Sequence, residues 1–386
     1  MWCNGGIDSL LSQQIYDLKS AADLPGGTCL RCSREWKMVR VHTAFLTVIC
    51  VMLACILCMP EHLRAQEENG SDSESSGAVS EYTLNDFYFD TVVSIRFDAG
   101  EDGKSLLKGC RSICDDIQHT FSRTDEDSEL YAVNHRAEEK VEVSSELAQL
   151  VQAGLDYYEI SDGRFDITVA PLSELWDFKS GDQIIPEETD IQSALRKVDA
   201  SAVHVESDKA SDQTVWYLTF DRSDTMIDLG ALVKGYAADR LADYLKENGV
   251  ISGLINLGGN VYAIGTKSDG SAWKIGIQKP FDTDIIDAVE VTDQSVVTSG
   301  VYERCFEKDG VLYHHILDPR TGYPVQNNLW GVSIISDSSL TGDALSTVCM
   351  LLGQEPAMEL IRQTDGVRAI FVDSDLNVTE CEQAGR

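Results

Sequence analysis

Basic side chains are scarce in this sequence. The 386 residues include 31 Lys and Arg against 64 Asp and Glu, which gives a formal net charge of −33. Such an acidic chain repels a phosphate backbone, and this argues against nucleic acid as a partner. A phosphorylated ligand would need a metal ion or a local group of cations to offset the field.

Proline is also rare, and several signature motifs are missing. With 8 prolines, 43% hydrophobic and 25% charged residues, the chain has the composition of a globular protein of one large domain or two. No P-loop, dinucleotide fingerprint or Ser/His/Asp order stands out. Cys29 and Cys32 have no second pair at zinc-site spacing. The 11 cysteines do not form a disulfide framework, because those of the C-terminal part are few and scattered.

An apolar run from 43 to 59 follows a short basic stretch. This order is typical of a secretory signal or a single membrane anchor, although the run is slightly short for a bilayer. Met52-Leu-Ala-Cys55 resembles a bacterial lipobox, so Cys55 is a candidate for lipidation. Met38 opens a conventional signal. We therefore expect 1–37 to be an upstream extension and 38–59 to be the signal or anchor.

Residues 60–81 are polar, acidic and rich in Ser and Gly. They show no apolar period, which predicts a disordered tether. The remaining chain, 82–386, is expected to form a single folded domain. An anchor followed by a tether predicts that this domain lies at the extracytoplasmic face of a bacterial cell membrane.

Helix and strand patterns mix within 82–386 without regular βαβ alternation. Aromatic and β-branched residues at 87–97 predict a strand, and apolar residues at helical spacing predict a helix over 106–117. Ser144 or Ser145 is expected to cap the next helix. Further strands are expected near 203–205, 215–220, 254–264, 273–278, 289–297, 330–335 and 367–372, and helices over 232–248, 341–352 and 356–363. The mixture predicts an α+β fold with mixed or antiparallel sheets and flanking helices.

The most informative run is Tyr313-His-His-Ile-Leu-Asp-Pro-Arg-Thr-Gly-Tyr-Pro324. Side chains alternate between the faces of a strand, so only one of His314 and His315 would face a site. Pro319 fixes φ and Gly322 allows a positive φ, which holds the following loop in a defined shape. A base at a strand end beside such a loop suits an active site. An ordinary hairpin with two incidental histidines fits the run equally well.

Asp343 and Thr347 lie four positions apart, on one face of a predicted helix and near its amino end. A carboxylate and a hydroxyl are hard oxygen ligands that suit Mg²⁺. From the spacing alone, a helix cap at Asp343 and a packed hydroxyl at Thr347 are somewhat better supported.

Asp228-Leu-Gly-Ala-Leu-Val-Lys234 lies at a predicted strand-to-helix junction. Exposed backbone there can contact phosphate, and Lys234 can neutralise its charge. A cap at Asp228 with Lys234 in solvent is the open alternative. The stretches 257–260 and 298–304 offer glycines and hydroxyls, but ordinary turns contain the same residues.

Phe165 and Asp166 precede an aromatic cluster that includes Trp176. An aromatic wall beside a carboxylate suits a planar ring ligand. A core corner with a capped turn explains the pattern at least as well.

Six motifs, taken in order, closely resemble those of the ApbE family of FAD:protein FMN transferases. The motifs are Gly163-Arg-Phe-Asp-Ile-Thr-Val-Ala-Pro-Leu, Asp228-Leu-Gly-Ala-Leu-Val-Lys-Gly-Tyr-Ala, Asn256-Leu-Gly-Gly, Thr298-Ser-Gly-x-Tyr-Glu-Arg, His315-Ile-Leu-Asp-Pro-Arg-Thr-Gly and Asp343-Ala-Leu-Ser-Thr. They cover nearly all of 82–375, and six matches in order are far more specific than any one of them.

The resemblance implies a Mg²⁺-dependent reaction in which FAD is split, FMN is joined through its phosphate to a threonine of a target flavoprotein, and AMP leaves. It implies that Asp343, Thr347 and the backbone carbonyl of Ala231 hold the metal. His315 is implied to accept the proton of the target threonine. The positions matched to the flavin nucleotide site are Arg164, Phe165, Asp166, Asp228, Lys234 and Leu317, with Thr298, Ser299 and Gly300 as weaker matches.

Thr124 stands where some members of the family carry a tyrosine that can stack on the isoalloxazine ring, and Phe89 is expected to supply an apolar contact instead. The family also includes members that hydrolyse FAD to FMN and AMP. A Mg²⁺-dependent FAD pyrophosphatase is therefore the alternative, and a lipoprotein that only binds flavin is a third hypothesis. The expected targets are exported or membrane-associated flavoproteins of redox systems.

Overall fold

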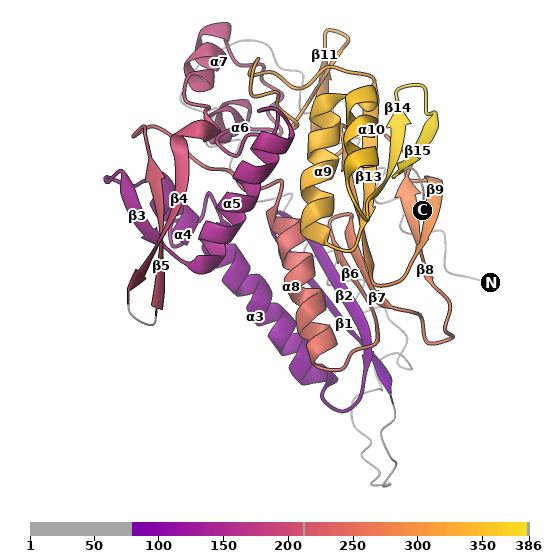
Figure 1. The fold of residues 1–386 in the computed structure, drawn as a ribbon. Coiled ribbons are helices and arrows are strands. Elements are labelled where there is room, and N and C mark those ends of the chain that lie inside the picture. The colour runs from indigo at the N-terminus through magenta and orange to yellow at the C-terminus, as the bar shows by residue number, and fades with distance from the viewer. Residues whose placement is uncertain (1–78, 211–212, 384–386) are drawn as a thin grey trace, which may run out of the picture. The chain divides into compact units, whose positions relative to one another are not determined.

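The computed structural model describes residues 79–210 and 213–383, which fold around an eight-stranded sheet (Figure 1). The strands, in sheet order, are β1 (Ser80–Tyr88), β2 (Thr91–Ala99), β6 (Ser252–Leu257), β7 (Asn260–Gly265), β10 (Gln294–Gly300), β13 (Leu329–Ser336), β14 (Arg368–Asp373) and β15 (Val378–Glu382). Every neighbouring pair described in this sheet is antiparallel. The α+β prediction with antiparallel sheets is confirmed.

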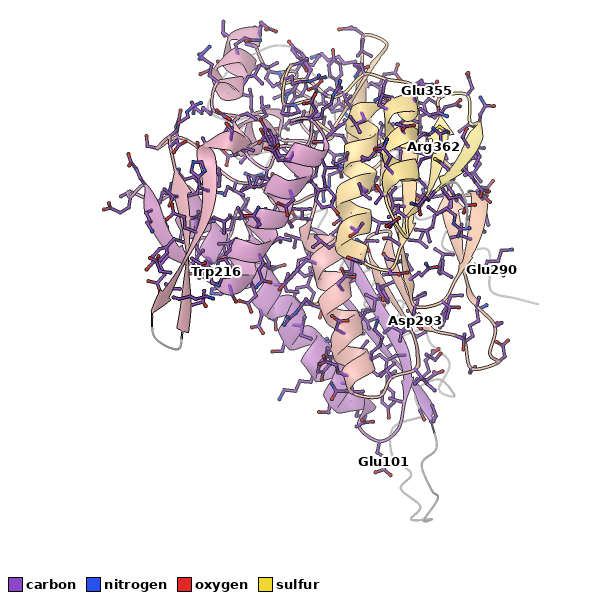
Figure 2. All side chains as sticks on the ribbon, viewed as in Figure 1. Glu101, Trp216, Glu290, Asp293, Glu355 and Arg362 are labelled. Atoms are coloured by element: carbon purple, nitrogen blue, oxygen red, sulfur yellow. The ribbon has the colours of Figure 1, made fainter. Side chains whose placement is uncertain are left out.

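Four helices cover one face of the sheet. They are α3 (Gly103–Phe121), α8 (Val233–Glu247), α9 (Ser339–Leu352) and α10 (Gln354–Gln363). Their apolar stripes bury the main core, because leucine, isoleucine and valine recur there at helical spacing. A hairpin of β8 (Trp273–Gln278) and β9 (Ile285–Val291) closes a smaller core on the opposite face. Figure 2 shows Glu290 on this hairpin, and Glu355 and Arg362 on the exposed side of α10.

A second group of elements lies beside the helical layer. A three-stranded sheet of β3 (Lys140–Val143), β5 (Gln213–Phe220) and β4 (Val203–Ala210) packs against α5 (Ser145–Ile160), and Trp216 of β5 is labelled in Figure 2. The other elements are α4 (Glu129–Asn134), α6 (Ala170–Trp176), α7 (Glu188–Leu195), the 3₁₀ turn η2 (Ala200–Ala202), β11 (Cys305–Lys308) and β12 (Val311–His314). The strands predicted near 203–205 and 215–220 appear as β4 and β5, which pair antiparallel as a hairpin.

Local capping also agrees with the sequence. The Ser144 hydroxyl accepts a hydrogen bond from the Leu147 amide at 3.1 Å and starts α5, so the first of the two predicted caps is confirmed. The helices predicted over 106–117 and 232–248 appear as α3 and α8.

The strand predicted over 87–97 is wrong as a single strand. The chain turns at Phe89 and Asp90, where φ is 53° and 58°, and β2 then runs back along β1. A two-residue turn with both φ values positive matches the twist of the strands, but Phe is an unusual residue for it, and the apolar pattern concealed the turn. The strand predicted over 254–264 is also two strands, joined at Gly258 and Gly259.

The predicted signal or anchor at 38–59, with Cys55, lies outside the described residues. Strand β1 begins at Ser80, so it includes the last two residues of the expected tether. Contacts group the described residues into one compact unit. Among the described helices, none is long and apolar enough to cross a membrane.

Candidate active site

A cavity of about 830 Å³ lies where the β1–β2 turn, the end of α3, the stretch before α8, the end of β10 and α9 meet. Its volume is typical of a site for a ligand the size of a dinucleotide or smaller. The predicted site residues that line it are Phe89, Arg164, Phe165, Asp166, Asp228, Ala231, Lys234, Thr298, Ser299, His315, Leu317, Asp343 and Thr347. Gly300 is not part of the lining formed by the described residues; a Cβ there would meet the Tyr302 ring at 2.3 Å.

Asp343 is the most deeply buried acid among the described residues of the cavity lining, and only 2% of it is exposed. Its Oδ2 accepts a hydrogen bond from the Gly235 amide at 2.8 Å, and its Oδ1 lies 3.2 Å from Lys234 Nζ. Burial raises the pKa of this carboxyl, while Lys234 and the Gly235 amide oppose the rise. Asp343 therefore does not cap its own helix; Ser338 does, by accepting a hydrogen bond from the Thr341 amide at 3.2 Å.

Helices α8 and α9 touch through Gly235. A Cβ at this position would meet the Ser339 carbonyl oxygen at 2.5 Å and the Asp343 Cβ at 2.8 Å. The glycine thus allows the backbone of α8 to approach α9 closely enough for its amide to hold the carboxylate. This contact sets the position of Asp343 in the cavity wall.

The oxygen groups predicted to hold a metal lie on the same cavity lining. Thr347 follows Asp343 by one turn of α9, and its hydroxyl lies 3.3 Å from the Asp343 carbonyl oxygen and 3.4 Å from Ser299 Oγ. Ala231 lies in the stretch just before α8. One carboxylate, one hydroxyl and one backbone carbonyl form an oxygen-only donor set, which fits Mg²⁺. Among the described residues, no group of three His, Cys, Asp or Glu side chains forms an alternative metal site.

The two histidines of the 313–324 run point to different environments. His314 ends β12, is buried, and its Nε2 lies 3.0 Å from the Val325 carbonyl oxygen. His315 lines the cavity, and its Nδ1 has no hydrogen-bond partner in the described part of the chain. Desolvation, then the charges of Arg304, His314 and Lys234, lower the pKa of His315 to about 3. The ring is neutral near pH 7 and can accept a proton. The predicted opposite orientation of the pair is confirmed.

A group of cations offsets the acidity of the chain at the cavity. Lys234, Arg164 and Arg304 all line it, and Arg123 enters from the loop after α3. Arg123 lies 2.8 Å from Glu174 and 3.3 Å from Asp228, so its charge is partly neutralised. The expected local cations for a phosphorylated ligand are therefore present.

Two predicted nucleotide-binding acids are held by their own chain. Asp166 accepts hydrogen bonds from the Thr168 amide at 2.7 Å and the Ala200 amide at 3.1 Å. Asp228 accepts one from the Gly230 amide at 2.9 Å and pairs with Arg123. These contacts shape the cavity wall.

Hydroxyls and aromatic rings complete the lining. Ser299 Oγ lies 2.8 Å from Ser346 Oγ, which connects the end of β10 to α9, the helix that carries Asp343 and Thr347. Trp176, predicted to be part of an aromatic wall, does not itself line the cavity formed by the described residues. It is buried and stacks on Phe178 with ring centroids 5.5 Å apart, and Phe178 lines the cavity. Thr124 also lies in the lining.

Sequence reasoning missed several charged residues of the cavity. Arg123 and Lys179 lie in loops that carried no motif, whereas Glu303 and Arg304 end the fourth motif, Thr298-Ser-Gly-x-Tyr-Glu-Arg, but were given no role. The signal that could have found Glu303 and Arg304 is their place directly after the hydroxyl-rich end of β10. The loop cations had no sequence signal, because only the fold brings them to the cavity.

Residues 89–371 match the ApbE family. The chain is 38% identical over 255 residues to a protein of Klebsiella pneumoniae named FAD:protein FMN transferase, covering 65% of this chain and 77% of that one. A protein of Treponema pallidum with the same name is 32% identical over 342 residues, covering 85% and 91%.

Solved structures show the same fold. The ApbE protein of Thermotoga maritima superposes with a TM-score of 0.70 at 32% identity, covering 78% of this chain and 97% of that one. The flavin transferase ApbE of Vibrio cholerae gives a TM-score of 0.71 at 25% identity, covering 80% and 98%.

Proposed function

From the premise that this chain belongs to the ApbE family and is an FAD:protein FMN transferase, we propose that it esterifies a threonine hydroxyl of a target flavoprotein with the FMN part of FAD. The observation that carries the proposal is the meeting, in one cavity, of the neutral His315 ring with Asp343, which is held at the α8–α9 contact. A neutral base and a carboxylate among cations suit phosphoryl-type transfer.

The proposed step is a single displacement at phosphorus. The threonine oxygen forms a bond to the FMN phosphorus, the bond from that phosphorus to the bridging oxygen breaks, and AMP leaves with that oxygen. The threonine proton passes to a ring nitrogen of His315. Lys234 and Arg304 lie in the cavity where they can offset the charge of the diphosphate, and Arg164 adds a third cation.

We assign Mg²⁺ to the Asp343 carboxylate, the Thr347 hydroxyl and the Ala231 carbonyl. Bound there, the ion would neutralise charge on the phosphate oxygens. Lys234 Nζ contacts the Asp343 carboxylate, so it is positioned to share that carboxylate with the Mg²⁺ ion and also to bind a phosphate oxygen.

Hydrolysis of FAD to FMN and AMP is the second candidate activity. It is favoured by Thr124, which lines the cavity where an aromatic ring would help to exclude water. Water would then take the place of the threonine hydroxyl in the same displacement.

One assay separates the two activities. The full chain is incubated with FAD, Mg²⁺ and an apo-flavoprotein whose native form carries FMN esterified to threonine. We expect AMP and a fluorescent acceptor band on a denaturing gel. AMP with free FMN and an unlabelled acceptor would instead identify a pyrophosphatase.

We further propose that the protein works at the extracytoplasmic face of a bacterial cell membrane, anchored through 38–59 or a lipid on Cys55, and that its targets are exported or membrane-associated flavoproteins. The apolar run and the lipobox-like sequence support this. Fractionation of cells expressing the wild type and Cys55→Ser tests it. Recovery of both proteins in the cytosol would contradict the proposal.

A further inference from the structure

The outer face of the β1–β2 hairpin exposes two large apolar side chains. Phe87 and Val92 are each 64% exposed and lie directly opposite one another in the register. The next pair on this face, Asn85 opposite Ser94, is polar. The apolar pair is therefore confined to the end of the hairpin that carries the turn.

Two glycines extend this row onto the neighbouring strands. The Gly258 amide donates a hydrogen bond to the Val92 carbonyl at 3.1 Å, so the β6–β7 turn lies beside Val92. A Cβ at Gly258 would meet Thr91 Oγ1 at 2.0 Å, whereas one at Gly259 would meet no described atom within 4 Å. Phe87, Val92, Gly258 and Gly259 thus form a flat strip, the hairpin shelf, with bare backbone at one end.

The hairpin shelf is continuous with the cavity, because two of its residues, Phe87 and Gly258, and the adjacent Thr91 line the cavity. A transferase that modifies a protein must admit a polypeptide at the mouth of this cavity. We propose that the hairpin shelf is the docking surface for the acceptor polypeptide: an apolar side chain covers Phe87 and Val92, and the backbone passes over Gly259. This inference rests on the proposed transferase function.

The chemistry of the shelf suits a polypeptide. Exposed apolar area beside a polar rim is typical of a protein-binding surface, and a glycine without a neighbour permits close backbone approach. A membrane is a poorer occupant, because the apolar area is limited to two side chains and the net charge of −33 repels anionic lipid. The outer edge of β1, which pairs with β2 alone among the described strands, leaves room for an extended segment.

The test compares the full-length wild type with the double variant Phe87→Thr/Val92→Thr. Threonine keeps strand propensity and both positions are in water, so the fold should persist. The matched control is Val378→Thr, which removes an exposed apolar side chain from β15 at the opposite edge of the sheet. The probes are FAD, by fluorescence titration, and the apo-flavoprotein described above, by covalent labelling.

We expect the KM for the apo-flavoprotein to rise about tenfold in the double variant, as for loss of an interface hot spot. The single variant Val92→Thr, at a residue outside the cavity lining formed by the described residues, should raise this KM in the same direction while its kcat and its Kd for FAD change less than twofold, and the control should match the wild type. An unchanged KM would overturn the docking surface and leave the transferase intact. A matching rise in the Kd for FAD would reassign Phe87 to the flavin pocket. A wild type that labels no acceptor while releasing AMP would reject the proposed function and this inference with it.

Discussion

The two walls of the cavity are built in opposite ways. On the α8–α9 wall, Asp343 is buried and held by the Gly235 amide and Lys234. On the β1–β2 wall, Asp90 pairs with Lys179 through side chains that are 56% and 48% exposed, and Arg304 Nη2 reaches the Asp90 carbonyl at 3.3 Å.

This difference assigns the chemical step to the α8–α9 wall and the entry of the acceptor protein to the β1–β2 wall. A charge in a desolvated wall acts through a low dielectric and cannot reorient freely. Charges in water are screened, and their pairs contribute little to stability. We infer that the α8–α9 wall holds its side chains rigidly to bind the phosphate groups, whereas the side chains of the hairpin wall can move when an acceptor protein binds.

The largest effect is expected for Asp343→Asn. The amide keeps the shape but removes the charge that would hold Mg²⁺, so AMP release should fall by about 10³-fold. Asp337→Asn, an exposed residue just before α9, is the control and should keep wild-type activity. Undiminished AMP release by Asp343→Asn would remove the carboxylate from the mechanism.

His315→Gln should slow transfer by about 10²-fold or more, in the range of general-base catalysis, while FAD affinity changes little. Loss of FAD affinity alone would make His315 a binding residue.

The pH profile of the wild type sharpens this prediction. The pKa of His315 in the free protein is about 3, so its neutral form persists down to low pH. The diphosphate of FAD adds negative charge near Lys234 and Arg304, which raises that pKa. The acid limb of kcat should therefore lie at higher pH than the acid limb of kcat/KM, and His315→Gln should abolish the limb in kcat. Coincident limbs in the wild type would contradict this order.

Gly235→Ala tests the fixed wall directly. The added methyl must push α9 away from α8, because its contacts at 2.5–2.8 Å include backbone atoms. A shift near 1 Å can cost about 10²-fold in rate, so we expect at least a tenfold loss of AMP release together with a lower Tm. Gly100→Ala is the control, since a Cβ there has its nearest neighbour at 3.8 Å. Equal activity of the two variants would show that the α8–α9 contact does not position Asp343.

Asp239→Asn tests how the amino end of α9 is held in the α8–α9 wall. The Asp239 carboxylate accepts hydrogen bonds from the Ser339 amide at 2.6 Å, the Leu340 amide at 3.0 Å and the Ser338 hydroxyl at 2.8 Å, at the amino end of α9. Loss of its charge should reduce the free energy of unfolding by about 1–2 kcal/mol. Asp243→Asn, exposed one turn later on α8, should leave urea denaturation unchanged.

Lys179→Met should have the smallest effect. Its partner Asp90 lies in water, and such pairs contribute about 0–1 kcal/mol. We expect the urea midpoint to change little. A loss of stability comparable to that of Asp239→Asn would show that the hairpin wall is as rigid as the α8–α9 wall.

The sequence by itself determined the fold class, most helices and strands, and 13 of the residues that line the cavity. The helices followed from apolar spacing, and Ser144 from its place before an apolar run. The chemistry at His315, Asp343 and Lys234 was recognisable because each lies in one of the six motifs that resemble the ApbE family, whereas the spacing of these residues alone left ordinary structural roles open.

Tertiary structure alone decided what depends on distant partners. It turned Phe89 and Asp90 into a hairpin, brought Arg123 and Lys179 to the cavity, and showed that Ser338, not Asp343, caps α9. It also placed Gly235 against Asp343, a contact between residues 108 positions apart. Local sequence encodes periodicity and turn chemistry, whereas burial and hydrogen-bond partners arise only when separate helices and strands pack together.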